Sequence, residues 1–278
     1  MTGLVSRATA TLCPTGSGAA LHSRFERSHS RPTGTVASGG AASGGTSAIR
    51  GLVMEMANVL YDATLWRREL VRLLVRLHVP ATYPAFFHRW EREYSIDVER
   101  GFRQYEEAFQ AFLLSAGLSW GQIDEVEAVA RCQRHAYEEN VRPLPAVSAA
   151  LSALTKRGLP LVALCDAAEP ASVLERRIER LGLRGVFQHV LSSFDLGAAK
   201  PAPECYAAAL AALELPAAEA AFIGCDRRSL DGAAAYGLRT IAFNCQEEVE
   251  ADARLESFAD IVELVEHWPS VGSVEASP

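Results

Sequence analysis

Short apolar segments that alternate with helical patterns constrain the fold of this chain more than any other feature. Five of these segments are predicted to be strands: Ile49–Met56, Leu159–Asp166, His189–Ser193, Ala220–Asp226 and Arg239–Asn244. Helical patterns lie between them at Pro145–Gly158, Pro170–Gly182 and Pro203–Leu215. Near-continuous apolar strands joined by helices indicate right-handed crossovers and a parallel sheet covered on both faces. The sequence therefore predicts a doubly wound, Rossmann-like α/β fold with its functional groups at the carboxyl ends of the strands.

One interval interrupts this alternation. Between Asp62 and about Asn140 the pattern is helical only, in the segments Thr64–Val79, Tyr83–Tyr94, Asp97–Gly117 and Ser119–Asn140. An all-helical insert after the first strand is expected to form a cap above the carboxyl end of that strand. Aromatic residues recur at helical spacing inside it, namely Tyr83, Phe86, Phe87, Trp90 and Tyr94. A stripe of this kind is more often core than a ligand wall or a dimer surface, so it is predicted to line the inside of the cap.

These patterns divide the chain into four regions. Residues 49–62 and 141–268 are predicted to form the α/β core, and residues 63–140 the helical cap. Residues 1–48 are rich in Gly, Ala, Ser and Arg and contain Glu26 as their only acid. Such a segment buries too little apolar surface to order itself, so it is predicted to be a disordered tail, in preference to the organelle transit peptide that it also resembles. Residues 269–278 are predicted to be a flexible C-terminal tail.

Charge and cysteine usage narrow the function classes. The net charge is -7, and lysine occurs only at Lys156 and Lys200, so nucleic-acid binding is not expected. The six cysteines are scattered, without zinc-finger spacing, which suits a reducing compartment. An apolar run of 18 residues is absent from the sequence, so membrane association is not expected either. We expect a cytoplasmic protein.

Four short motifs, each at the end of a predicted strand, carry the candidate chemistry. They are "MEMANVLYD" (54–62), "LVALCD" (161–166), "SSFDLGAAKPAPECYAAAL" (192–210) and "FIGCDRRSLDGAAAYGLRTIAFN" (222–244). In this order and at these strand ends the motifs resemble those of haloacid dehalogenase-like (HAD) hydrolases with a helical cap after the first strand. The resemblance covers about Ile49 to Trp268.

The resemblance implies a role for each motif position. In the family, an Asp at the position of Glu55 attacks the phosphoryl group, and an Asp at the position of Ala57 serves as general acid and base. A hydroxyl at the position of Cys165 and the ammonium of Lys200 hold the phosphate. Acids of the fourth motif, near Cys225 and Ser229, help to hold Mg²⁺.

This chain departs from the family at most of these positions. Glu55 moves the attacking oxygen by roughly 1 Å, a misplacement that can cost about 100-fold in rate. Ala57 cannot transfer a proton, which removes roughly another 100- to 10,000-fold. Cys225 offers sulfur where Mg²⁺ requires oxygen, and Asp226, one residue later, is the candidate replacement. Asp166 is predicted to add negative charge beside Cys165, and Lys200 to pair with Glu55.

The sequence thus predicts a member of this hydrolase family whose catalysis is impaired, a pseudo-phosphatase that binds a small ligand or a protein partner in the former active-site cleft. The alternative is an active phosphomonoester hydrolase with a rewired site that uses Glu55, Asp226 and Lys200. The candidate phosphate-binding residues are Cys165, Asp166 and Lys200, and the candidate metal ligands are Glu55, Cys225 and Asp226. Either no cofactor or Mg²⁺ is expected, with zinc, held by Cys165 and Cys225 among the carboxylates, as a further hypothesis. A homodimer is a further alternative, in which the aromatic stripe of the cap would be the dimer surface.

Overall fold

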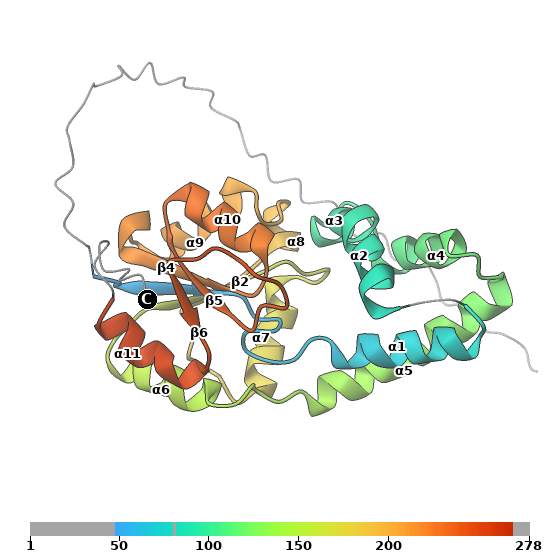
Figure 1. Cartoon of the computed structure of the whole chain (residues 1–278), viewed down its shortest axis with the longest axis horizontal. Helices are drawn as coiled ribbons and strands as arrows, with labels where there is room; N and C mark the ends of the chain where they lie inside the picture. The colour runs from blue at the N-terminus through green and yellow to red at the C-terminus, as the bar shows by residue number, and fades with distance from the viewer. Residues whose placement is uncertain (1–47, 80–81, 269–278) are drawn as a thin grey trace, which may run out of the picture. The chain divides into compact units, whose positions relative to one another are not determined.

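The computed structural model describes residues 48–79 and 82–268 (Figure 1). The predicted tails at 1–48 and 269–278 lie outside the described residues, apart from Ala48. In the described part, no helix is long and apolar enough to cross a membrane.

A parallel sheet of six strands forms the core, in the order β3-β2-β1-β4-β5-β6. The strands are β1 (Gly51–Met54), β2 (Leu161–Cys165), β3 (His189–Ser192), β4 (Ala220–Gly224), β5 (Arg239–Phe243) and β6 (Ala253–Leu255). The first five correspond to the predicted strands, whereas β6 was not predicted. The predicted parallel α/β fold is confirmed, and β1 lies between β2 and β4, which places the ends of three motif strands side by side.

Helices cover both faces of the sheet (Figure 1). The side chains of each strand alternate between the two faces and pack against these helices. Leu52 and Met54 face a core formed with α6 (Val147–Lys156), α7 (Ala171–Arg180) and α11 (Ile261–Glu266). Val53 faces the opposite core, formed with α9 (Pro203–Leu213) and α10 (Arg227–Tyr236). Because β1 is buried on both faces, its apolar sequence is required for packing whatever the chemistry at its end.

The interval after β1 is helical, as predicted, and forms a core of its own. Its helices are α1 (Leu65–Arg76), α2 (Tyr83–Glu93), α3 (Ser95–Glu99), α4 (Tyr105–Ser115) and α5 (Trp120–Asn140). Phe86, Phe87 and Trp90 are buried and Tyr94 packs against them, which confirms the interpretation of the stripe as cap core. The side chain of Tyr83 is outside the described part.

The prediction of one helix over Asp97–Gly117 was wrong. The chain forms α3, turns at Gly101 with φ of 71°, and starts again as α4. Glycine adopts this left-handed conformation at low cost, which allows the break. The turn brings the end of α3 against α8 (Ser193–Leu196), where a methyl group at Gly101 would lie 3.3 Å from the Phe194 ring.

Candidate functional site

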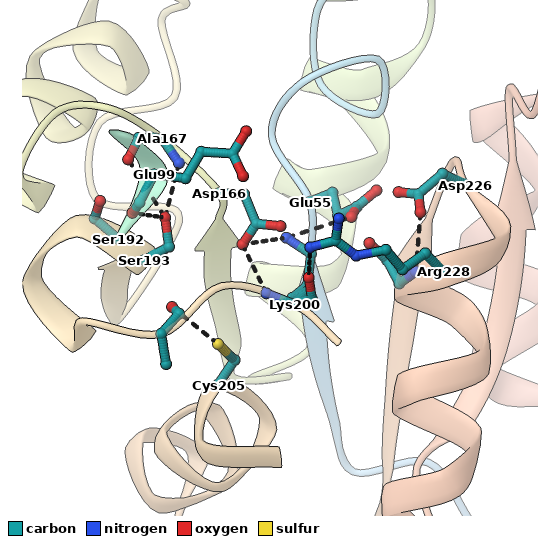
Figure 2. Close-up of polar contacts among 12 residues, drawn as sticks. Glu55, Glu99, Asp166, Ala167, Ser192, Ser193, Lys200, Cys205, Asp226 and Arg228 are labelled. Carbon is teal, nitrogen blue, oxygen red and sulfur yellow. Dashed lines mark hydrogen bonds and ion pairs between the residues drawn. The ribbon is translucent and has the colours of Figure 1, made fainter. Parts of the chain in front are cut away.

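The candidate site lies at the carboxyl ends of β1, β2 and β4 (Figure 2). Glu55 is the first residue after β1, Asp166 the first after β2, and Cys225 the first after β4. Since these strands are neighbours, three motifs far apart in the sequence meet at one edge of the sheet. The fourth group, Lys200, precedes α9 and reaches the same point.

Glu55 is held from two sides. Its backbone N–H donates to the Ile223 carbonyl at 3.0 Å, which extends the pairing of β1 with β4 by one residue. Its Oε2 accepts a hydrogen bond from the Cys225 backbone N–H at 2.9 Å, and its Oε1 lies 3.4 Å from Lys200 Nζ. Gly224 leaves room for this carboxylate, because a methyl group there would lie 3.3 Å from Oε2. The Glu55 side chain is 6% exposed, so its carboxylate is fixed and largely removed from water.

Lys200 is the ammonium at the centre of the site and is 2% exposed. Its Nζ lies 3.3 Å from Asp166 Oδ1 as well as 3.4 Å from Glu55 Oε1. Asp166 Oδ1 also accepts a hydrogen bond from the Lys200 backbone N–H at 3.0 Å. The predicted pairing of Lys200 with Glu55 is therefore present, and Asp166 provides a second anionic partner.

Burial and charge act in opposite directions on these groups. Burial lowers the pKa of Lys200, but its contacts with Asp166 and Glu55 outweigh burial, so the pKa is raised and the ammonium stays charged. Burial raises the pKa of Glu55, and the negative charge of Asp226 raises it further against the lowering effect of Lys200. The positive charge of Lys200 is thus already balanced by two carboxylates before any anionic ligand arrives.

The loop that follows β1 is held by hydrogen bonds to its own side chains. Asn58 takes the left-handed conformation, with φ of 60°, that a glycine would otherwise supply. Its side-chain oxygen accepts a hydrogen bond from the Ala63 N–H at 3.0 Å. Asp62 Oδ1 accepts from the N–H of Thr64 at 2.8 Å and from its hydroxyl at 2.6 Å, which directs the chain into α1. Ala57 lies in this loop with a methyl group where the family has a carboxylate.

Three side chains that could ligate a metal ion lie on the β4 side of Glu55, and they are called the donor group below. One ligand atom each from Glu55, Cys225 and Asp226 can be chosen so that all three lie within 4.8 Å of one another. Cys225 Sγ also lies 3.7 Å from the Ala57 carbonyl oxygen. Asp226 Oδ1 accepts a hydrogen bond from Ser229 N–H at 2.9 Å and so caps α10. Asp231, the other acid of this motif, is exposed on α10 and is not among these three residues.

Cys165 does not join this donor group. It is 7% exposed, its thiol is free, and burial raises its pKa to about 12. A neutral buried thiol of this kind behaves as a small apolar side chain. The zinc hypothesis that paired Cys165 with Cys225 is thus not supported for Cys165, and both cysteines are free thiols.

The cap contributes a carboxylate that sequence analysis missed. Glu99, the last residue of α3, extends toward Asp166 (Figure 2), and its backbone carbonyl accepts a hydrogen bond from Ser193 Oγ at 2.6 Å. Burial raises the pKa of Glu99, and Asp166 raises it further.

The guanidinium of Arg228 donates to the Lys200 carbonyl oxygen. His88 and His135, the cap histidines considered from the sequence, are both exposed.

Mg²⁺ does not fit the donors present. This ion requires oxygen ligands in near-octahedral geometry, and the group at Glu55 presents sulfur from Cys225 among its three side-chain donors. Asp226 is part of the donor group, as the sequence suggested, but its Oδ1 already accepts the hydrogen bond that caps α10.

Comparison with known proteins identifies the family of the chain. The sequence model of the family "Hydrolase: haloacid dehalogenase-like hydrolase" matches residues 49–237. The chain therefore belongs to the haloacid dehalogenase-like hydrolase family, as its motifs indicated.

Two curated relatives are named as phosphatases. A ribulose-1,5-bisphosphate 5-phosphatase from Halopiger xanaduensis is 32% identical over 117 residues, which are 42% of this chain and 48% of the relative. A phosphoglycolate phosphatase from Pectobacterium atrosepticum is 28% identical over 131 residues, or 45% of this chain and 55% of the relative. The chain thus spans about half the length of the curated relatives it matches.

Among solved structures, L-2-haloacid dehalogenases share the fold. One has a TM-score of 0.61 at 23% identity and covers 79% of this chain and 100% of its own. The enzyme from Xanthobacter autotrophicus has a TM-score of 0.58 at 20% identity, with coverage of 78% and 98%.

Proposed function

We propose that this protein does not transfer phosphoryl groups through an acyl-phosphate on its first motif, and that it acts by binding a small ligand or a protein partner at the ends of β1, β2 and β4. One observation carries the proposal. The carboxylate at the nucleophile position is buried and held by Cys225 N–H and Lys200, while the residue two positions on is Ala57, which has no proton to give.

The charge around Lys200 supports the same conclusion. Asp166 and Glu55 are both within 3.4 Å of its ammonium, and Glu99 and Asp226 add further negative charge nearby. A phosphate dianion at this point would have to displace carboxylates from Lys200 and face the negative charge of the others. Neutral or cationic ligands meet no such barrier.

An active phosphomonoester hydrolase is the second candidate, because the donor group places Asp226 beside Glu55 as that function would require. The two curated relatives named as phosphatases favour the same substrate class. In this alternative Glu55 is the nucleophile or base, Asp226 binds the metal, and Lys200 binds the phosphate.

Restoring the family's carboxylates tests the proposal. The variant Glu55→Asp, Ala57→Asp, Cys225→Asp is expected to gain Mg²⁺-dependent hydrolysis of small phosphate esters over an inactive parent. The matched control carries Asn at the same three positions, which keeps the side-chain size but removes the charge. Gain of activity in the Asp variant alone supports the proposal; a parent that is already active and loses its activity on Glu55→Ala supports the second candidate.

A further inference from the structure

The donors beside Glu55 form a mixed set of sulfur and oxygen atoms. Carboxylates come from Glu55 and Asp226, a thiol comes from Cys225, and their three ligand atoms lie within 4.8 Å of one another. The backbone carbonyl of Ala57 brings a further oxygen to the same place, 3.7 Å from the sulfur. The four groups come from two chain segments, the loop after β1 and the turn after β4.

This position is a favourable one for a ligand. The strands β1 and β4 are hydrogen-bonded neighbours, and the connections of the sheet run in opposite directions from this point, to β2 and β3 on one side and to β5 and β6 on the other. Ligands of open α/β sheets bind at this switch in strand order, outside the carboxyl ends of the strands.

The donor atoms are open to a ligand. In the part of the chain that the structure describes, Asp226 Oδ2 makes no hydrogen bond or ion pair, since the α10 cap uses Oδ1. Cys225 Sγ lies 3.7 Å from the Ala57 carbonyl oxygen and contacts the Glu55 carboxylate, and its side chain is partly buried. Glu55 Oε2 accepts a hydrogen bond from the Cys225 backbone N–H, and the Ser229 side chain also contacts this carboxylate, whose two oxygens offer about four acceptor sites in all.

The chemistry of this set decides which ion it suits. One thiolate, two carboxylates and a carbonyl give four ligands of mixed softness, which suits a borderline ion in tetrahedral coordination. Mg²⁺ and Ca²⁺ prefer oxygen alone and higher coordination numbers. From this geometry we infer that Glu55, Cys225 and Asp226 form a site for a borderline divalent transition-metal ion of the Zn²⁺ type, in place of the Mg²⁺ site of the family.

This inference deepens the proposed binding role of the site and names the ligand class. On binding, a metal–sulfur bond forms and the S–H bond of Cys225 breaks, with the proton passing to solvent. The ion would also balance the negative charge that Glu55 and Asp226 bring together.

Metal binding by the full chain, freed of metal with a chelator, tests the inference. We expect one tightly bound Zn²⁺ per chain by elemental analysis after dialysis, a raised melting temperature with Zn²⁺, and no comparable effect of Mg²⁺. Substitution with Co²⁺ should give a thiolate-to-cobalt charge-transfer band, which reports the metal–sulfur bond directly.

Variants locate the ion. Cys225→Ser should remove the charge-transfer band and weaken Zn²⁺ binding by about 100-fold or more, since even changes in the outer shell of a metal site cost about 10- to 100-fold. Cys132→Ser, at an exposed thiol on α5, is the matched control and should leave both unchanged. Cys225→Asp should trade Zn²⁺ for Mg²⁺ binding, and it tests the same site should the serine variant fold poorly.

Two results would overturn the inference: no Zn²⁺ retained by the unaltered chain, or Zn²⁺ binding and a cobalt band that survive Cys225→Ser. Phosphate-ester hydrolysis that requires Zn²⁺ and the intact cluster would instead refute the proposed loss of catalysis while leaving the metal site in place. The metal site and the loss of phosphoryl transfer can therefore be refuted independently of each other.

Discussion

The two sides of Glu55 differ in how far their polar groups are already satisfied. On the β2 side, Lys200 is buried and paired with both Glu55 and Asp166, and Asp166 is bound in turn to the Lys200 backbone. On the β4 side, Cys225 and Asp226 keep unused capacity beside the same carboxylate. This difference supports the two proposals made above, namely that the β2 side now has a structural role and that the β4 side binds a cation. Variants on each side should therefore affect different properties.

The largest effect is expected from Lys200→Met. This change leaves the buried Glu55 and the half-buried Asp166 without their counter-ion, and breaking a buried pair in this way costs about 3–5 kcal/mol in the free energy of unfolding. Urea denaturation at neutral pH measures it. The control is Lys156→Met, at the other lysine of the chain, which is exposed. Equal stability of the two variants would show that the β2 side is not structural.

Gly232→Ala should be the next most destabilising change. A methyl group at this position would lie 2.5 Å from Pro201 Cβ and 2.6 Å from the Tyr206 hydroxyl, so α10 could no longer pack closely on the segment that carries Lys200. Overpacking of this kind costs about 1–3 kcal/mol. Gly121→Ala on α5 meets nothing within 4 Å and should stabilise its helix by about 0.5–1 kcal/mol. Thermal melts that rank the two variants the other way would contradict a packing role for Gly232.

On the β4 side, Cys225→Ser should change stability little. Its partly buried thiol makes weak sulfur hydrogen bonds with the Ala57 carbonyl and Glu55, and a serine hydroxyl can replace them, so in the absence of metal we expect a change of about 1 kcal/mol or less. Urea denaturation of the metal-free protein measures this. A loss comparable with that of Lys200→Met would mean that the two sides do not differ.

The smallest effect concerns Glu99, which faces Asp166, Lys200 and Arg228 from the cap. Its pKa is raised in the folded protein, so its stabilising contribution is present below the unfolded pKa and is lost as the pH rises through the folded pKa. Glu99→Gln cannot ionise, and it should therefore be more stable than the parent at neutral pH. The difference should shrink as the pH falls below the ordinary glutamate value.

Melting temperatures of the parent and the Glu99→Gln variant across this pH range measure the effect. Glu125→Gln, at an exposed position of α5, is the control and should show no such trend. A Glu99 variant that is less stable at neutral pH would show that its contacts with Lys200 and Arg228 outweigh burial and Asp166.

Local patterns were sufficient to predict much of the fold. The apolar runs at β1, β2, β4 and β5 are buried on both sheet faces, so burial is visible in the sequence itself. The strand β6 was not predicted, because Ala253–Leu255 is only three residues long and includes an arginine. The break between α3 and α4 at Gly101 was not predicted, because a glycine within a helical pattern does not reveal whether the chain turns there.

The site was predictable only where a motif placed its residues. Glu55, Asp166, Lys200, Cys225 and Asp226 follow strand ends, and the strand order brings them together. Glu99 carries no local signal, because its approach to Asp166 depends on how the cap contacts Ser193, ninety-four positions away in the chain. That Asp226 both caps α10 and joins the donor group also depends on the tertiary fold.

The most direct measurement is phosphate release by the unaltered full chain from a panel of small phosphate esters, with Mg²⁺, with Zn²⁺ and with a chelator. The account predicts release no faster than that of the Glu55→Ala variant under every condition. Metal-stimulated turnover that disappears in Glu55→Ala would contradict it.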